Sequence, residues 1–263
     1  MKYNKIIFCG IGGSAMPGEI ISSLNLKRPA LLARENLPKH ANSKTLCLII
    51  SYSGNTKETI KLYNQAKKKK CQILIITSGG KLSKTKNNTV LIEKGYLPRE
   101  ALFIMLEPIF KILKIPFKDL SEKTKKQVEK KAKKLAKKIK NKHPIIYVSS
   151  EKLKAVAYRW EDQFSENAKI FSEVNFFPEL AHNDIESIPE KNHKIIFLIN
   201  KQTKQIKKAA KMLKPIKIKL KGKNFLEKMF YGIYLGDYTS KYLAKLKHRD
   251  YKKIPQINKL KKK

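Results

Sequence analysis

Short hydrophobic runs recur at intervals along the chain, and each is bounded by Gly, Ser, Asn or Lys. Their length and their richness in Ile, Leu and Val are typical of buried β-strands. In the first half of the chain they cover residues 6–8, 46–50, 73–76 and 90–92. Because stretches of helical period lie between several of these runs, the pattern predicts a parallel sheet with helices on both faces.

The same alternation begins again in the second half of the chain. Strands are expected at residues 145–148, 195–199 and 216–220, and helices at about 152–164 and 204–213. We infer that the chain is a duplication of one α/β unit.

Three further helices complete the pattern. One should start near Pro98 and end before Pro116, where it closes the first lobe. A strongly charged segment from Ser121 to Lys142 keeps apolar residues at helical spacing and predicts a connecting helix capped by Ser121. Residues 225–246 predict a C-terminal helix. The expected divisions are therefore 1–118, 119–142, 143–222 and 223–263.

The chain carries a net charge of +38, from 59 Lys and Arg residues against 21 Asp and Glu residues. Such an excess suggests nucleic-acid binding through the release of counterions. Only five of the basic residues are arginine, however, whereas base readers and phosphate clamps favour arginine. We therefore interpret the charge as a solvated surface and do not expect nucleic acid as a partner.

The 41% hydrophobic content of 263 residues is enough for a sizeable core without disulfides. No apolar run approaches the roughly 18 residues that a membrane span needs. Cys9, Cys47 and Cys71 lie in or beside apolar runs, which indicates buried, reduced thiols. The expected protein is soluble and cytoplasmic and has no signal peptide.

Two loops that join a predicted strand to a predicted helix suit a phosphate group. The first, Gly10-Ile11-Gly12-Gly13-Ser14, can bring backbone N–H groups to an anion at a helix N-terminus. It also approximates a dinucleotide fingerprint, but Glu35 is a poor candidate for the acidic residue expected roughly 20 residues later. The second loop, Ser51 to Thr59, offers the three hydroxyls of Ser51, Ser53 and Thr56 before the helix, where a helix cap needs one, and so favours phosphate binding.

A third loop, Thr77-Ser78-Gly79-Gly80-Lys81-Leu82, ends the next strand. It should lie on the same carboxyl edge of the sheet, where open α/β folds bind ligands. The equivalent loops of the second half, at 149–152 and 200–203, have no glycines and few hydroxyls. The duplication is therefore expected to have kept one phosphate site.

These loops and several further motifs occur together in one known family. The motifs are Gly10-Ile11-Gly12-Gly13-Ser14, Ser51-Tyr52-Ser53-Gly54-Asn55-Thr56, Thr77-Ser78-Gly79-Gly80, Gly95-Tyr96-Leu97-Pro98-Arg99, Glu166-Asn167-Ala168-Lys169, Pro178-Glu179-Leu180-Ala181-His182-Asn183 and Leu260-Lys261. Over nearly its whole length the chain resembles the archaeal and bacterial bifunctional phosphoglucose/phosphomannose isomerases, a branch of the SIS-domain (sugar isomerase) phosphoglucose isomerase superfamily. The resemblance implies an α/β fold of two SIS-type, flavodoxin-like subdomains with parallel sheets and a helical C-terminal tail.

The resemblance also implies a reaction, the interconversion of glucose 6-phosphate and fructose 6-phosphate, and of mannose 6-phosphate and fructose 6-phosphate, by a homodimer without metal or cofactor. Carried onto the matching positions, it implies that the sugar phosphate is held by Gly13, Ser14, Ser51, Ser53 and Thr56. It further implies that Arg99 polarises the reacting oxygens and Glu166 is the base. His182, often supplied in the family by the second subunit, opens the sugar ring, and Lys261 contacts the substrate.

The residue types suit this chemistry independently of the family. Aldose–ketose isomerisation moves a proton between C1 and C2 through a cis-enediol, and one carboxylate can carry that proton. A cationic Arg beside the enediolate oxygens stabilises the developing charge, and a His can protonate and deprotonate the ring oxygen.

Some alternatives stay open. Glu179 competes with Glu166 for the role of base, because it lies close to His182 in the sequence. A non-catalytic sugar-phosphate sensor is the alternative function, although it would need neither Glu166 nor His182. The other histidines show no ligand spacing with Cys or carboxylates, so no metal site is expected; they are His40, His143, His193 and His248.

Overall fold

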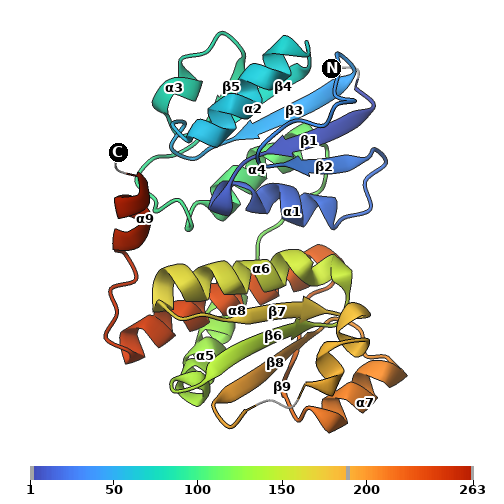
Figure 1. The fold of residues 1–263 in the computed structure, drawn as a ribbon, viewed down its shortest axis with the longest axis vertical. Helices are drawn as coiled ribbons and strands as arrows, with labels where there is room; N and C mark the ends of the chain where they lie inside the picture. The colour runs from blue at the N-terminus through green and yellow to red at the C-terminus, as the bar shows by residue number, and fades with distance from the viewer. Residues whose placement is uncertain (1–2, 188–189, 262–263) are drawn as a thin grey trace. The chain divides into compact units, whose positions relative to one another are not determined.

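The computed structural model describes residues 3–187 and 190–261, and the chain divides into two compact units, Met1–Phe117 and Lys118–Lys263. Each unit is built on one parallel sheet with helices packed on both faces (Figure 1). This confirms the expected fold class. Within the described residues, no helix combines the length and the apolar character needed to cross a membrane.

The first unit contains a five-stranded sheet in the order β2-β1-β3-β4-β5, with all neighbours parallel. The strands are β1 (Lys5–Cys9), β2 (Ala30–Ala33), β3 (Thr45–Ile50), β4 (Gln72–Thr77) and β5 (Asn88–Leu91). Strand β3 is buried at every position, which explains its unbroken run of apolar residues after Thr45. The order reverses direction between β1 and β3, and this places a crevice at their carboxyl ends.

The helices of the first unit are α1 (Met16–Ser22), α2 (Lys57–Lys68), α3 (Gly80–Ser83) and α4 (Leu102–Ile112). Leu62 and Ala66 of α2 pack on one face of the sheet, in a core that includes all three cysteines. On the other face, Gly18 of α1 lies so close to β1 that an added Cβ would be 2.6 Å from the Phe8 Cβ. Burial raises the pKa of the Cys71 thiol to about 12, so the expectation of inert, reduced thiols agrees with the packing.

The second unit repeats this arrangement with four strands in the order β7-β6-β8-β9, again all parallel. The strands are β6 (His143–Val148), β7 (Glu173–Phe176), β8 (His193–Ile199) and β9 (Ile216–Lys219). This is the order of β2-β1-β3-β4 in the first unit, as the inferred duplication requires.

Helices α5 (Glu122–Ile139), α6 (Lys154–Gln163) and α8 (Phe225–Leu246) form one layer of the second unit, and α7 (Lys204–Met212) covers the other face of its sheet (Figure 1). The hydroxyl of Tyr242 on α8 donates to Glu129 on α5 over 2.8 Å. Ser121 caps α5 by accepting from the Thr124 N–H, as predicted. The charged segment is therefore an integral part of the second unit's helical layer. The last element of the described residues is the short helix α9 (Pro255–Lys261).

Two edge strands were not predicted, and one helix starts later than expected. Strands β2 and β7 have four residues each and are only partly buried, so their sequences lack the long apolar runs of central strands. Helix α4 begins at Leu102 because the segment before it forms a turn, closed by a 2.7 Å hydrogen bond from the Glu100 N–H to the Leu97 carbonyl.

Candidate functional site

The loops after β1 and β3 meet at the point where the strand order of the first sheet reverses. The N–H of Tyr52 donates to Ser14 Oγ over 3.2 Å and joins the two loops directly. The second unit has the same bond at the equivalent place, from the Asn200 N–H to Ser149 Oγ over 2.9 Å. This bridge is therefore a feature of the repeated fold, and the two units differ in the glycines and hydroxyls around it.

The second loop presents its hydroxyls at the start of a twelve-residue helix, α2. Ser51 is almost fully buried, and its hydroxyl donates to Thr56 Oγ1 over 3.2 Å. Although Thr56 occupies the cap position, its side chain makes no capping bond to the described first turn of α2. The third hydroxyl of this loop belongs to Ser53, which is exposed. The first N–H groups of α2 are thus left for an anion, which the helix dipole also favours.

The third loop is joined to the second loop by hydrogen bonds that fix the second loop's conformation. Ser78 Oγ donates to the Tyr52 carbonyl over 2.6 Å, and Asn55 Oδ1 accepts from the Lys81 N–H over 2.9 Å. Thr77 Oγ1 is likewise used inside the loop, where it donates to the Gly79 carbonyl over 2.9 Å. All three polar loops do converge, as predicted, but the hydroxyls of Thr77 and Ser78 in the third loop are used in hydrogen bonds that shape the second and third loops.

Arg99 reaches the same region through the turn before α4. An added Cβ on Gly13 would be 3.6 Å from the Arg99 Cα and 3.4 Å from the Pro98 carbonyl oxygen, so this turn lies against the first loop. The Arg99 residue is only 3% exposed. The structure therefore brings together, in the first unit, Gly13, Ser14, Ser51, Ser53, Thr56 and Arg99.

A substitution at Gly54 tests whether the position of the second loop matters for this cluster of residues. Its φ is +65°, and an added Cβ would be 1.8 Å from the Gly79 carbonyl oxygen, so Gly54→Ala must push the second and third loops apart. Because a shift of about 1 Å in a binding group can cost about 10²-fold, we expect kcat/KM to fall by about that factor.

The matched control is Gly95→Ala. Gly95 also has a positive φ, +98°, but nothing lies within 4 Å of the added Cβ. This variant carries the backbone strain without the collision and should lose far less activity. Equal losses in the two variants would show that strain, and not the contact between the loops, causes the effect.

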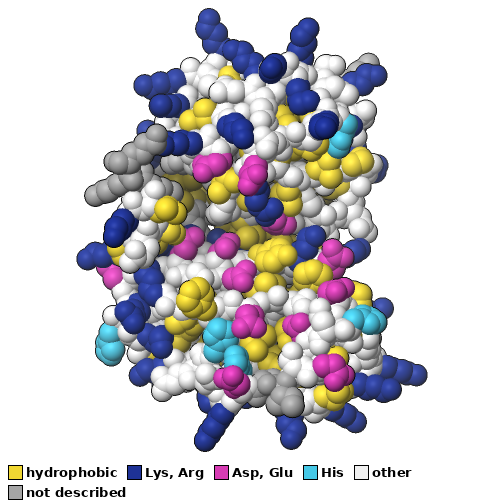
Figure 2. Space-filling model, viewed as in Figure 1, with side chains coloured by type: hydrophobic (Ala, Val, Ile, Leu, Met, Phe, Trp, Pro, Cys, Tyr) yellow, Lys and Arg dark blue, Asp and Glu magenta, His cyan; other side chains and the backbone are white. Residues whose placement is uncertain are grey.

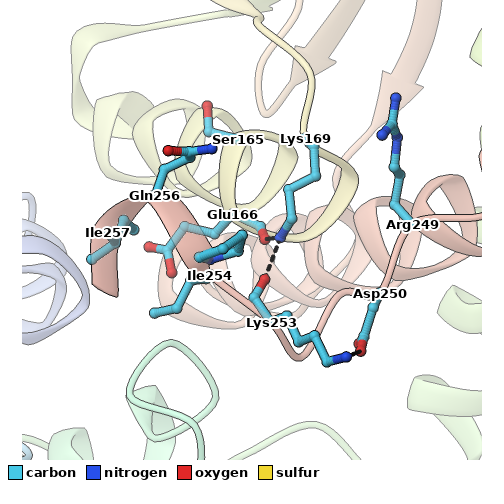
Figure 3. Close-up of a pocket in the computed structure, with 10 residues that line it drawn as sticks. Ser165, Glu166, Lys169, Arg249, Asp250, Lys253, Ile254, Gln256 and Ile257 are labelled. Carbon is cyan, nitrogen blue, oxygen red and sulfur yellow. Dashed lines mark hydrogen bonds and ion pairs between the residues drawn. The ribbon is translucent and has the colours of Figure 1, made fainter. Parts of the chain in front are cut away.

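In the second unit, Glu166 lies on a π-helical turn, η3 (Phe164–Ala168), that extends α6 by one turn. Such turns often occur at functional sites because they redirect side chains. The turn ends at Lys169, whose φ of 57° is left-handed and whose Nζ donates to the Glu166 carbonyl and, over 2.7 Å, to the Lys253 carbonyl. Figure 3 shows these bonds and the Glu166 carboxylate pointing away from Lys169.

Glu166 borders a cavity of about 620 Å³ inside the second unit (Figure 3). Its lining residues come from η3 and from the segment that leads into α9: Ser165, Glu166, Lys169, Arg249, Asp250, Lys253, Ile254, Pro255, Gln256 and Ile257. A volume of this size is in the range of small-molecule sites, roughly 300–1,000 Å³. The residues that lead into α9 had no predicted role, and the only residue of this region with one was Lys261, for which the family resemblance implies a contact with the substrate. The side chain of Lys261 lies outside the described part of the structure.

A buried polar network lies directly beneath the π-helical turn. Arg159, 2% exposed, donates to both carboxylate oxygens of Asp237 on α8, over 2.9 and 2.8 Å. The buried amides of Gln163 and Asn167 are 2.6 Å apart, and Asn167 also bonds to Ser240 over 2.9 Å. The turn that carries Glu166 is therefore fixed by buried amides on both sides, Gln163 before it and Asn167 near its end. A sequence signal existed, since Arg159 and Gln163 lie four residues apart on an otherwise apolar helix face.

Glu179 begins a separate short helix of the second unit, η4 (Glu179–Ala181), and His182 is its C-cap residue. The His182 N–H donates to the Glu179 carbonyl over 2.9 Å, and both side chains are exposed. Glu166, in contrast, is half-buried at the cavity wall. Glu166 and Glu179 therefore differ in burial, and the partly buried Glu166 is the better candidate for a proton-transferring carboxylate.

The lysines are scattered over the surface, as Figure 2 shows for one face of the molecule. Lys and Arg side chains occur over both units in this view and do not gather into one basic stripe. This distribution agrees with the interpretation of the charge as a solvated surface.

Comparison with known proteins places the chain in a family. The model of the "Bacterial phospho-glucose isomerase C-terminal SIS domain" matches residues 128–263, and the model of the "SIS domain" matches residues 29–96. A bifunctional phosphoglucose/phosphomannose isomerase of Thermoplasma volcanium is 36% identical, with 99% of this chain and 91% of that protein aligned. Its counterpart in Caldicellulosiruptor bescii is 35% identical over 99% of this chain and 89% of that protein.

Among solved structures, a glucosamine-6-phosphate deaminase from Thermotoga maritima superposes with a TM-score of 0.74, covering 96% of this chain and 88% of that one. Only 17% of the aligned residues are identical, so this likeness speaks for the fold alone. The family is established by the two relatives that align with 99% of this chain and by the two domain models. The chain belongs to the bifunctional phosphoglucose/phosphomannose isomerase family.

Proposed function

We propose that this protein interconverts glucose 6-phosphate and fructose 6-phosphate, and mannose 6-phosphate and fructose 6-phosphate. The observation that carries the proposal is the cradle of glycines and hydroxyls between β1 and β3, in a chain 36% identical over 99% of its length to a relative of that name. Sugar phosphates are its small-molecule partners.

In this proposal the first unit holds the phosphate group. The N–H groups at the start of α2 and the hydroxyls of Ser14, Ser53 and Thr56 donate to its oxygens, and Ser51 does the same by turning its hydroxyl away from Thr56 Oγ1. Gly13 lets the backbone approach the ligand closely. Holding the inert phosphate supplies binding energy and orientation for a reaction several bonds away, at C1 and C2.

The proton transfer is assigned to Glu166. Its carboxylate removes the proton from C2 of the aldose phosphate and returns it to C1 of the cis-enediol, which yields the ketose. Arg99 stabilises the negative charge that develops on the C1 and C2 oxygens. His182 moves a proton to and from the ring oxygen when the cyclic sugar opens, and Lys261 contacts the substrate.

Two further assignments complete the proposal. The protein is a cytoplasmic homodimer, as the family resemblance implies, and it has no nucleic-acid partner. A sensor function would not require a carboxylate fixed on a π-helical turn by buried amides, and this arrangement speaks for catalysis.

The decisive experiment is a coupled assay of fructose 6-phosphate conversion in the presence of a chelator, with mannose 6-phosphate tested alongside. We expect turnover of both glucose 6-phosphate and mannose 6-phosphate without added metal. If a well-folded protein binds fructose 6-phosphate but turns over neither aldose, the sensor function replaces the isomerase.

A further inference from the structure

We propose that His143, Glu173 and His193 form a binding site for a divalent transition metal such as Zn²⁺. The three residues are the first residues of β6, β7 and β8, at the amino edge of the second unit's sheet. In the parallel register His143 pairs with His193, so their side chains lie on the same face. Glu173 reaches them from β7, the neighbour of β6 on its other side.

The side chains already converge. The His143 Nε2 is 3.1 Å from Glu173 Oε1, and the two imidazole rings meet edge to face with centroids 5.0 Å apart. One ligand atom from each of the three residues lies within 4.8 Å of the others. Zinc bonds of about 2.0–2.2 Å in a tetrahedral arrangement place neighbouring ligands roughly 3.3–3.5 Å apart. The His143–Glu173 pair is at about that separation, and Glu173, with a 66% exposed side chain, is free to rotate as the site closes.

His193 must change its hydrogen bonding when the metal binds. Its Nδ1 accepts from the Glu190 N–H over 3.1 Å, so the neutral ring carries its proton on Nε2. Coordination through Nε2 moves this proton to Nδ1 and breaks the bond to Glu190. The cost is one hydrogen bond near the surface, and the Glu190 amide becomes a specific reporter of occupancy.

The ligand set selects the kind of metal. Two imidazoles and one carboxylate suit zinc and neighbouring transition metals, and three protein ligands leave a fourth position open. Lys142, Lys191 and Lys194 adjoin the cluster in sequence, and Lys142 Nζ donates to the Lys191 carbonyl over 3.0 Å. The positive charge of these lysines repels cations, so electrostatic attraction cannot account for metal binding here. Binding therefore depends on imidazole coordination, which excludes Mg²⁺ and Ca²⁺.

The site is separate from the proposed isomerase chemistry. In both sheets the loops discussed above follow the carboxyl ends of the strands, whereas this cluster lies at the amino ends of β6, β7 and β8. A metal held there would link three strand starts and would stabilise the folded second unit by binding only to it.

The test is titration of metal-free protein with Zn²⁺ by calorimetry. We expect one Zn²⁺ per chain in the wild type, and an affinity at least about tenfold lower in His143→Ala, in His193→Ala and in the milder variant Glu173→Gln. The control His40→Ala, an exposed histidine of the first unit, should bind as the wild type does. Mg²⁺ should produce no saturable heat.

An amide NMR spectrum supplies a second readout that does not depend on variants. The Glu190 resonance should shift as Zn²⁺ is added to the wild type, in proportion to occupancy. Zinc uptake that persists unchanged in His143→Ala/His193→Ala, or a wild type that takes up none, would overturn the proposal. Circular dichroism confirms that each variant is folded.

Discussion

Glu166→Gln is expected to lower kcat for fructose 6-phosphate conversion by about 10²–10⁴-fold, with little change in KM. The substitution keeps the size of the side chain and removes the group that accepts the proton. The phosphate cradle lies in the first unit and is untouched, so ground-state binding should survive. Steady-state kinetics with fructose 6-phosphate and mannose 6-phosphate measure both constants.

Glu179→Gln is the matched control, since Glu179 is the same residue type, exposed, and also in a short helical turn of the second unit. It should keep kcat within a few-fold of the wild type. If Glu179→Gln abolishes turnover and Glu166→Gln does not, the base is Glu179, and the π-helical turn has another role.

Asp237→Ala is expected to destabilise the second unit by about 3–5 kcal/mol. The Asp237 carboxylate accepts hydrogen bonds from Nε and Nη2 of Arg159, and the Arg159 side chain is only 2% exposed. Removal of the carboxylate takes two charge-assisted hydrogen bonds from a buried guanidinium, and that penalty is much larger than the loss of a surface pair. Urea unfolding followed by circular dichroism gives the free energy of unfolding.

The surface pair Lys154–Glu151 provides the comparison. It spans 3.4 Å with side chains 35% and 62% exposed, and such pairs contribute about 0–1 kcal/mol. Glu151→Ala should therefore change stability by less than about 1 kcal/mol. A similarly small change in Asp237→Ala would contradict the interpretation of the network as a buried anchor.

The same network connects stability to the proposed base. Arg159 and Gln163 lie on α6, and Asn167 lies on the turn that follows, one residue beyond Glu166. We therefore expect the residual folded fraction of Asp237→Ala to have a lower kcat, because the support of the Glu166 turn is loosened. This support was not predicted, since polar residues on a helix give no indication of which partner they meet.

The central strands and the loops rich in glycine and hydroxyl residues were predictable from local pattern. A strand such as β3, buried on both faces, is apolar at every position after Thr45, and the glycines after it meet a local demand of turn geometry, since Gly54 has a positive φ. The edge strands β2 and β7 were missed because pairing on one side demands little of four residues.

The sequence by itself determined the α/β class, the duplicated order of elements and the loops rich in glycine and hydroxyl residues, and through the family motif it predicted Glu166 as the base. Only the tertiary structure decided that the third loop supports the second, that buried amides and the Arg159–Asp237 pair anchor the Glu166 turn, and that His143, Glu173 and His193 meet. The reason is that hydrophobic period and turn chemistry are local properties of the chain. Strand register and helix packing instead join residues that are far apart in the chain, up to 113 positions for Tyr242 and Glu129, and no local pattern records those pairings.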